Sequence, residues 1–388
     1  MAKNTTNKTS GFSFLEMDKM LSKIDGFETG SIFAENTFSE ITEWIGTGNY
    51  LLNAQISGSL FGGYPNSRSI GLIGDPSTGK TFLCFNAVRE AQKIGYNVIY
   101  CDTEGAMDRQ SAAKFGVDLN LIRYQPIKTV SQFKNFTVNV IDYVKKARAK
   151  GQEPKVMIVL DSLGMLPTDK ELRDAMEGKN AADMGLKAKE LRALFRAITL
   201  DLTGAKIPLI CTNHTTTGMG GFMPTKESAG GDGPIFAMST QIFLSKAQLK
   251  EGNTKTGIIV TSNIKKSRFT IPIPVKFHIS FTQGMNPYVG LQDYVSWETC
   301  GIERGKLIEG KDGTITFEPS DSPQARWAIK HLGKTITSSQ LFTPEVFTED
   351  VLKQLDENVI KHAFILPDST DNKEYLESID SDEEGDEG

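Results

Sequence analysis

The stretch that decides the fold reads Ile70-Gly71-Leu72-Ile73-Gly74-Asp75-Pro76-Ser77-Thr78-Gly79-Lys80-Thr81. Its last eight residues, Gly74 to Thr81, match the P-loop pattern GxxxxGK[ST], with an apolar strand pattern before them and a helical pattern after them. In such a loop, backbone N–H groups turn inward around phosphate oxygens, and the helix N-terminus adds favourable potential. We therefore expect all eight residues to bind a nucleotide, with Lys80 at the β- and γ-phosphates and the Thr81 hydroxyl on Mg²⁺.

Strand and helix patterns alternate along the chain from this stretch onward. Apolar, β-branched runs predict strands at Ile70–Ile73, Val98–Cys101, Val156–Leu160, Leu209–Cys211, Ile242–Leu244 and Ile258–Val260. Helical patterns lie between them, at Thr81–Ile94, Val130–Ala149 and Leu186–Thr203. This alternation predicts an α/β fold, in which helices flank both faces of a mainly parallel central sheet.

Four regions are expected along the chain. Residues 1–45 are predicted to be an N-terminal arm with a short helix, residues 46–291 the α/β core, residues 292–366 a small C-terminal region, and residues 367–388 an acidic disordered tail. The segment Glu374–Gly388 carries eight acidic residues and no basic one, so without it the net charge of −5 becomes +3. A tethered polyanion can compete with phosphates for a basic surface, and a tail that serves solubility fits the composition equally well.

Two carboxylates follow predicted strands, at the strand ends where parallel sheets bind ligands. Asp161 ends the run Val156–Leu160, and we expect it to hold the metal through coordinated water. Glu104 follows Val98–Cys101, and we expect it to orient and deprotonate the attacking water. Asp102 is its rival, because it lies two residues earlier on the same strand face. Glu104 is preferred for its longer side chain and its position past the strand end.

Composition narrows the classes of protein that the chain can belong to. No stretch approaches the roughly 18 consecutive apolar residues of a membrane span. The N-terminus, MAKNTTNKTS, lacks the apolar core of a secretory signal. The four cysteines are widely spaced without a CxxC pair, and Cys101 and Cys211 lie in apolar, strand-like runs, which favours buried, reduced thiols. These features predict a cytoplasmic protein, in the host cytoplasm if the source is viral, with no membrane partner.

Several short motifs around the P-loop resemble the RecA recombinase family, and the sequence looks most similar to the UvsX-type recombinases of large tailed phages. The resemblance runs from about Gly48 to Leu291. Besides the P-loop it is carried by Gly62-Gly63-Tyr64-Pro65, Asp102-Thr103-Glu104-Gly105, Asp161-Ser162-Leu163-Gly164, Asp183-Met184-Gly185-Leu186, Asn213-His214-Thr215, Gly230-Gly231-Asp232-Gly233-Pro234 and Lys266-Ser267-Arg268. The P-loop alone is generic, whereas its combination with Asn-His-Thr and Lys-Ser-Arg is much more specific.

The resemblance implies an ATP-dependent DNA recombinase, which is a DNA-dependent ATPase with ATP and Mg²⁺ as cofactors. Such a protein forms a helical filament on single-stranded DNA, pairs it with homologous duplex DNA and exchanges strands. A single-strand-binding protein and a loader protein are its expected partners.

Two alternative functions stay open. One is a hexameric replicative helicase with the same ATPase core, which usually has a sizeable helical domain before the P-loop. The other is an ATP-gated accessory paralogue, which often loses the glutamate or the interface cations.

The resemblance also implies roles for residues around the nucleotide. Lys266 and Arg268 would reach the γ-phosphate of a neighbouring subunit, as an arginine finger does in trans. His214 would sense the γ-phosphate, with a neutral imidazole that donates to a phosphate oxygen. Asp108 matches an acidic position that contacts adenine, while Ser111 stands where the family usually has a stacking aromatic residue.

Two segments would contact DNA by the same resemblance. The first is Pro167–Ala182, in which phosphate contacts are expected from Lys170, Arg173 and Lys179. The second is the glycine-rich segment Thr215–Gly233. Its backbone can approach phosphates closely, and an apolar side chain can wedge between bases. The candidate DNA-contacting residues of this second segment are Met219, Phe222, Met223 and Lys226.

Overall fold

The structure is a computed structural model that describes residues 14–21, 23–24, 37–105, 107–179, 184–218, 225–228, 238–310 and 315–365. The chain divides into two compact units, Met1–Glu40 and Ile41–Gly388. In the first unit, α1 (Phe14–Leu21) confirms the short helix predicted there. In the part of the chain that the structure describes, no helix combines the length and apolar character needed to cross a membrane.

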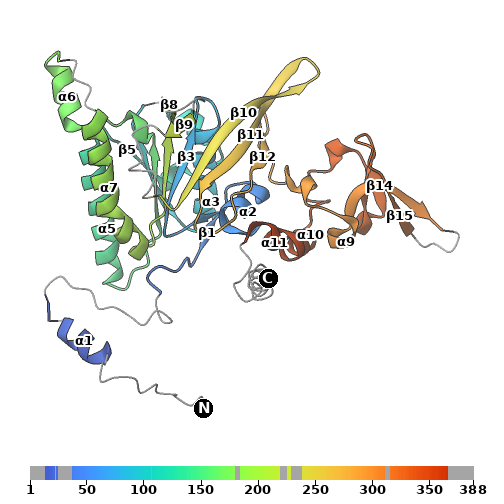
Figure 1. Cartoon of the computed structure of the whole chain (residues 1–388), viewed down its shortest axis with the longest axis horizontal. Helices are drawn as coiled ribbons and strands as arrows, with labels where there is room; N and C mark the ends of the chain where they lie inside the picture. The colour runs from blue at the N-terminus through green and yellow to red at the C-terminus, as the bar shows by residue number, and fades with distance from the viewer. Residues whose placement is uncertain are drawn as a thin grey trace, which may run out of the picture. The chain divides into compact units, whose positions relative to one another are not determined.

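A nine-stranded sheet organises the second unit (Figure 1). In spatial order its strands are β13 (Gly284–Met285), β12 (Val275–Ser280), β11 (Thr254–Lys266), β10 (Thr240–Glu251), β3 (Ser69–Gly74), β7 (Leu209–Asn213), β6 (Val156–Asp161), β4 (Asn97–Asp102) and β5 (Ile122–Pro126). Neighbouring strands from β10 to β5 pair in parallel. The strands β11 to β13 extend the sheet in antiparallel fashion. The prediction of a mainly parallel central sheet is confirmed.

Helices cover both faces of this sheet (Figure 1). The helices α2 (Tyr50–Ser57) and α3 (Lys80–Lys93) pack on one face, and α5 (Val130–Arg148) and α7 (Met184–Gly204) on the other. Apolar residues recur every three or four positions along α7, and this spacing places them on one buried face of the helix. These buried residues are Leu191, Leu194, Phe195, Ile198 and Leu202.

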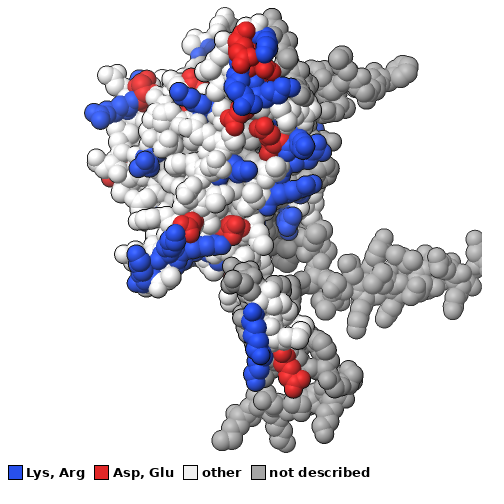
Figure 2. Space-filling view, turned by 90° about the vertical axis from the view of Figure 1, so that its left-hand side faces the viewer, with Lys and Arg blue, Asp and Glu red and all other residues white. Residues whose placement is uncertain are grey.

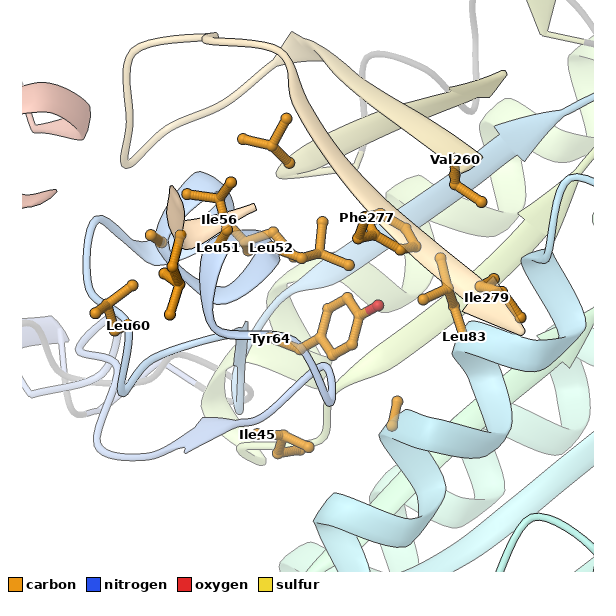
Figure 3. Close-up of a cluster of buried hydrophobic side chains, with 14 of the residues drawn as sticks. Ile45, Leu51, Leu52, Ile56, Leu60, Tyr64, Leu83, Val260, Phe277 and Ile279 are labelled. Atoms are coloured by element: carbon orange, nitrogen blue, oxygen red, sulfur yellow. The ribbon is translucent and has the colours of Figure 1, made fainter. Parts of the chain in front are cut away.

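The segment before the P-loop strand closes one side of the core (Figure 3). It contains β1 (Trp44–Ile45), α2 and β2 (Tyr64–Pro65), and β1 pairs with β2. Its buried apolar side chains share one cluster with Leu83 of α3 and with residues of the antiparallel strands, such as Phe277. Each fully buried leucine or isoleucine of this kind contributes about 2 kcal/mol. The four cysteines are unpaired and buried, as predicted for Cys101 and Cys211.

Short elements follow three of the parallel strands at their carboxyl ends. They are α4 (Arg109–Ala113) after β4, α6 (Asp169–Met176) after β6, and the hairpin of β8 (Thr215–Gly218) and β9 (Thr225–Ser228) after β7. All of them therefore emerge from the edge of the sheet that also carries the P-loop.

The C-terminal region packs onto the core of the same unit. Its four-stranded antiparallel sheet has the order β15 (Ile315–Pro319), β14 (Ile302–Glu309), β16 (Trp327–Ile329) and β17 (Lys334–Ile336). The helices α9 (Trp297–Cys300), α10 (Glu349–Leu355) and α11 (Lys361–Phe364) accompany it, with a π-helix, η7 (Asp356–Ile360), between the last two. The buried carboxylate of Asp356 accepts hydrogen bonds from the Ser59 hydroxyl (2.8 Å) and the Leu60 N–H (2.6 Å). These bonds tie the last helices to the connection between α2 and β2.

Candidate nucleotide-binding site

The P-loop lies between the buried strand β3 and the helix α3. Gly79 caps the helix with a φ of +93°, a left-handed conformation that favours glycine. A Cβ atom at this position would also lie 2.7 Å from Cδ1 of Ile279. The loop therefore approaches β12 closely. At the N-terminus of α3, the backbone N–H groups of the first turn have no partner within the helix and can bind an anion.

Lys80 folds back into the loop. Its ammonium group donates to the carbonyl oxygens of Gly74 (2.8 Å) and Asp75 (2.9 Å). Burial lowers the pKa of Lys80, and the carboxylates of Asp161 and Glu104 partly oppose this effect. The amine thus occupies the centre of the loop, where phosphate oxygens can replace the carbonyl oxygens as acceptors.

Two side chains from other elements hold the outer part of the loop. The Thr215 hydroxyl, at the start of β8, donates to the Asp75 carboxylate. The Lys246 ammonium, on β10, donates to the carbonyl oxygen of Pro76 at 2.7 Å. The loop is therefore linked directly to the segment that follows His214.

The Asp161 carboxylate receives three hydroxyl groups at the end of β6. Its Oδ2 atom accepts from the hydroxyls of Thr81 and Tyr100, both at 2.8 Å, and its Oδ1 atom accepts from the Thr212 hydroxyl. Sequence reasoning paired Thr81 with Asp161 but missed Tyr100 and Thr212. Their position near the ends of the strands on either side of β6 was the available signal.

The oxygen donors of Thr81 and Asp161 fit a magnesium ion. Mg²⁺ prefers oxygen ligands, and it usually keeps several waters and takes only one or two protein ligands beside substrate phosphates. Within the described ranges, no three His, Cys, Asp or Glu side chains form a metal-binding group. A site built from one hydroxyl, one carboxylate, water and phosphate is consistent with both points.

The contacts of the two rival carboxylates favour Glu104 over Asp102. Asp102 is 4% exposed, and its Oδ1 atom accepts from the backbone N–H groups of Glu104 and Gly105, both at 2.8 Å. Its Oδ2 atom accepts from the Tyr124 hydroxyl at 3.0 Å. Asp102 thus shapes the turn, whereas the exposed Glu104 side chain extends from it and accepts from the Ser162 hydroxyl at 2.9 Å.

His214 follows β7 and rests against Gly164. A Cβ atom at Gly164 would lie 2.4 Å from Cε1 of His214, so any larger residue would displace the imidazole. Burial lowers the pKa of His214, as do the charges of Lys187 and Lys80, while Glu104 raises it. The neutral imidazole is therefore favoured at the carboxyl edge of the sheet.

A pocket of about 720 Å³ opens beside the first turn of α3. Phe82, which directly follows Thr81, lines it together with Ser111 and Phe281. Phe281 follows β12 and is 61% exposed, with the Lys255 ammonium 5.5 Å from its ring centroid. Sequence reasoning found no aromatic partner for a base, because Phe281 lies far from Ser111 in the chain and in no motif.

Asp108 caps α4 at the rim of this region. Its carboxylate accepts from the backbone N–H and the hydroxyl of Ser111, both at 2.8 Å, and these bonds lower its pKa. It also lines a separate cavity of about 270 Å³ with Tyr100 and Tyr124. Its contact with adenine stays a prediction.

Lys266 and Arg268, the expected interface cations, lie at the amino ends of the parallel strands, whereas the P-loop lies at their carboxyl ends. On β11, Lys266 pairs with Gln241 of β10, and Gln241 pairs with Gly71 of β3. The last residue of β3, Gly74, pairs with Leu244, which lies three residues further along β10. Lys266 is thus roughly 10 Å from Gly74 along the strand direction, and the P-loop extends beyond Gly74.

Three cations gather at this amino edge of the sheet. Burial and the charge of Arg268 lower the pKa of Lys266, and the same two causes lower that of Arg68. Sequence reasoning missed Arg68, which immediately precedes β3. Lys265 instead lies over the Phe243 ring, 4.1 Å from its centroid. The cationic cluster of Arg68, Lys266 and Arg268 therefore does not share an edge with the P-loop of its own chain.

Part of the first predicted DNA segment forms the exposed helix α6, while residues 180–182 lie outside the described residues. Lys170 and Arg173 lie on α6, and Lys179 follows it in a 2.5 Å ion pair with Glu177. Figure 2 faces the side of the molecule that carries α5, α6 and α7, and it shows basic and acidic side chains interspersed there.

Most of the second predicted DNA segment lies outside the described residues. Met219, Phe222 and Met223 are among the residues that the structure does not describe. Lys226 lies in β9 opposite Thr217, and only its backbone is described. The DNA contacts of both segments therefore stay predictions.

The fold and the loop together define a P-loop ATPase with a RecA-like sheet. A profile of the RecA N-terminal domain matches residues 16–286, well over half of the chain, and the protein therefore belongs to this family. It is an ATP-dependent DNA recombinase and a DNA-dependent ATPase. Members of the family bind nucleotide with a divalent metal, bind DNA and form oligomeric filaments.

Curated relatives agree with this assignment over nearly the whole chain. A "Recombination and repair protein" of Enterobacteria phage T4 is 27% identical, with 89% of this chain and 90% of the relative covered. A "Protein RecA" of Synechococcus sp. (strain CC9902) is 26% identical, with 95% and 97% covered. A "Protein RecA" of Streptomyces ambofaciens is 29% identical, with 80% and 79% covered. These relatives confirm the resemblance to phage and bacterial recombinases.

Proposed function

We propose that the protein polymerises on single-stranded DNA as a helical filament, binds ATP and Mg²⁺ between adjacent protomers, and catalyses homologous pairing and strand exchange. The observation that carries this proposal is the separation of two half-sites within one chain. The P-loop lies at the carboxyl edge of the central sheet, and the cationic cluster lies at its amino edge. A complete site for phosphoryl transfer then requires two copies in a head-to-tail arrangement, which generates rings or helices.

At the nucleotide, each residue of the carboxyl edge has a distinct role. Lys80 and the loop backbone would bind the phosphates, and Thr81 and Asp161 would hold Mg²⁺, which would supply positive charge beside the phosphates. Glu104 orients water and accepts its proton. His214 donates to the γ-phosphate and reports its presence to β8, which begins at the next residue.

The adenine base would enter the pocket beside α3. The exposed ring of Phe281 offers the stacking surface that Ser111 lacks, and Phe82 closes the inner wall. Asp108 accepts two hydrogen bonds from Ser111, which lines this pocket, and we therefore place its contact with adenine at the rim. Asp108 would then hydrogen-bond to the base, and Phe281 would stack on it.

Lys266 and Arg268 would complete the site of the neighbouring protomer. Cations placed against the γ-phosphate stabilise the charge that builds up on its oxygens. Their neighbour Arg68 adds positive potential at the same edge.

The N-terminal arm, residues 1–45, would bind a neighbouring copy. The sheet ends at β5, beside a groove of about 470 Å³ that Leu121, Val140 and Tyr143 help to line. Tyr143 is 68% exposed. Among the residues that the structure describes, β5 pairs with β4 alone, and such an edge next to exposed apolar residues suits an added strand from a second chain.

DNA would lie against the segments that emerge from the carboxyl edge. Lys170, Arg173 and Lys179 would contact phosphates, and the glycine-rich segment would contact phosphates and bases through Met219, Phe222, Met223 and Lys226. A single-strand-binding protein and a loader protein would assist in the cytoplasm, which is the host cytoplasm if the source is viral.

Electron microscopy with single-stranded DNA and a non-hydrolysable ATP analogue tests the proposal. We expect continuous helical filaments from the wild type and none from the variant Lys80→Ala under the same conditions. Strand exchange between a single strand and a homologous duplex is measured in parallel. Closed rings without strand exchange would favour a hexameric helicase, and DNA binding without ATP hydrolysis would favour an accessory paralogue.

A further inference from the structure

The turn that follows β6, residues 162–164, contacts three functional groups at once. The Ser162 hydroxyl donates to Oε1 of Glu104 at 2.9 Å. Gly164 packs against the imidazole of His214 so closely that no Cβ atom fits between them. The carbonyl oxygen of Gly164 accepts a hydrogen bond from the Lys187 ammonium at 2.7 Å. A displacement of this turn would therefore move the partners of both Glu104 and His214.

Lys187 connects this turn to the first DNA segment. It lies in the first turn of α7, which begins at Met184, two positions after the end of that segment. Burial lowers the pKa of Lys187, and the charge of Glu171, on α6, raises it. A half-buried ammonium that donates to a backbone carbonyl forms a charge-assisted bond, and such bonds fix distance and direction well.

We propose that Lys187 is a positioning residue that couples DNA binding at residues 167–182 to ATP hydrolysis. When DNA binds at α6, Lys187 holds the turn at residues 162–164 in place. The turn then aligns Glu104 through Ser162 and His214 through Gly164. This inference rests on the proposed function and assigns a DNA-to-nucleotide path that is separate from the segment after His214.

The pH dependence of hydrolysis provides a second measurement of the coupling through Lys187, because charged groups around His214 shift its pKa. The charged groups that act on His214 are Lys187 of α7, Lys80 of the P-loop and Glu104. The two cations lower the pKa of the imidazole, and Glu104 raises it. Loss of the Lys187 charge therefore raises the pKa of His214. The acid side of the pH–rate profile should then move to higher pH.

The test compares full-length Lys187→Met, Lys187→Arg and wild type, with Arg196→Met as the matched control. Arg196 is an exposed cation more than two turns further along α7. We expect Lys187→Met to lower the DNA-stimulated kcat by about tenfold, as the loss of a charge-assisted hydrogen bond would. The apparent Kd for single-stranded DNA should change by less than about twofold. Lys187→Arg should restore both the rate and the pH profile.

A second variant keeps the inference testable if Lys187→Met folds poorly. Gly164→Ala inserts a methyl group against His214 and should reduce DNA stimulation in the same way. The double variant should lose no more than the worse single variant, because both changes interrupt one path. Additive losses, or a Lys187→Met protein with normal stimulation and an unshifted profile, would overturn the inference. Loss of DNA affinity in Lys187→Met alone would overturn it too, since Lys187 would then be a phosphate contact.

A wild type whose ATP hydrolysis is not stimulated by DNA would refute the proposed function itself.

Discussion

Replacing Asp102 and Glu104 by their amides separates the two carboxylates of one turn. Glu104→Gln keeps an acceptor for the Ser162 hydroxyl but removes the general base, so kcat should fall by about 10²- to 10⁴-fold. Its melting temperature should hardly change, because an exposed substitution alters stability by roughly 0.5 kcal/mol at most. Nucleotide binding and filament formation should persist.

Asp102→Asn should instead destabilise the fold. The buried carboxylate of Asp102 accepts from three backbone N–H groups and the Tyr124 hydroxyl. Asparagine keeps one acceptor, but it loses the charge and turns an N–H₂ group toward Tyr124. Each charge-assisted bond contributes about 1.5–3 kcal/mol, so we expect a total loss of about 2–3 kcal/mol. In a unit as large as Ile41–Gly388 this lowers the melting temperature by roughly 3–4 °C.

Calorimetry and steady-state ATPase assays on the same preparations check both expectations. The reasoning is refuted if Asp102→Asn melts like the wild type and traps long-lived filaments, while Glu104→Gln hydrolyses ATP normally. That outcome would identify Asp102 as the group that activates water.

Three further outcomes are expected. Lys80→Ala should lose DNA-stimulated hydrolysis because the loop loses its central ammonium, and a normal rate in an ATPase assay would contradict the P-loop assignment. Deletion of residues 374–388 should tighten DNA binding at low salt, and the difference in Kd from the wild type should fade above roughly 0.2 M salt in anisotropy titrations. A difference in Kd that does not change with salt would contradict electrostatic competition. The pKa of His214 is lowered in the fold, so the unfolded chain takes up its proton first as pH falls below about 6.5. Urea unfolding should therefore show wild-type stability falling more than that of His214→Gln over this range, and parallel curves would contradict the shift.

The sequence was sufficient for the parts of the fold that repeat a local pattern. The P-loop and the strand-end position of Asp161 follow from short apolar runs and fixed spacings, which need no tertiary information. The antiparallel strands were harder to predict in full. The outer half of the hairpin β10–β11 is exposed on both faces, so it lacks the alternation that marks a half-buried strand.

The sequence could not reveal contacts between residues that are distant along the chain. The preference for Glu104 over Asp102 rested on side-chain length, and the hydrogen bonds of Asp102 supplied the physical reason. Phe281 and Ser111 line one pocket although 170 positions separate them. The contact of Lys187 with a carbonyl oxygen has no sequence signature, because any residue type can present that acceptor.

The placement of the P-loop and the cationic cluster at opposite edges of one sheet has a genetic consequence. A chain that lacks Lys80 still presents intact cations to its neighbour, and a chain that lacks Arg268 still offers an intact loop. Mixed in equal amounts, two such defective chains would build about one fully equipped interface in four, because each interface takes one edge from each neighbour. Co-expression of the two inactive alleles should therefore restore part of the activity that neither shows alone.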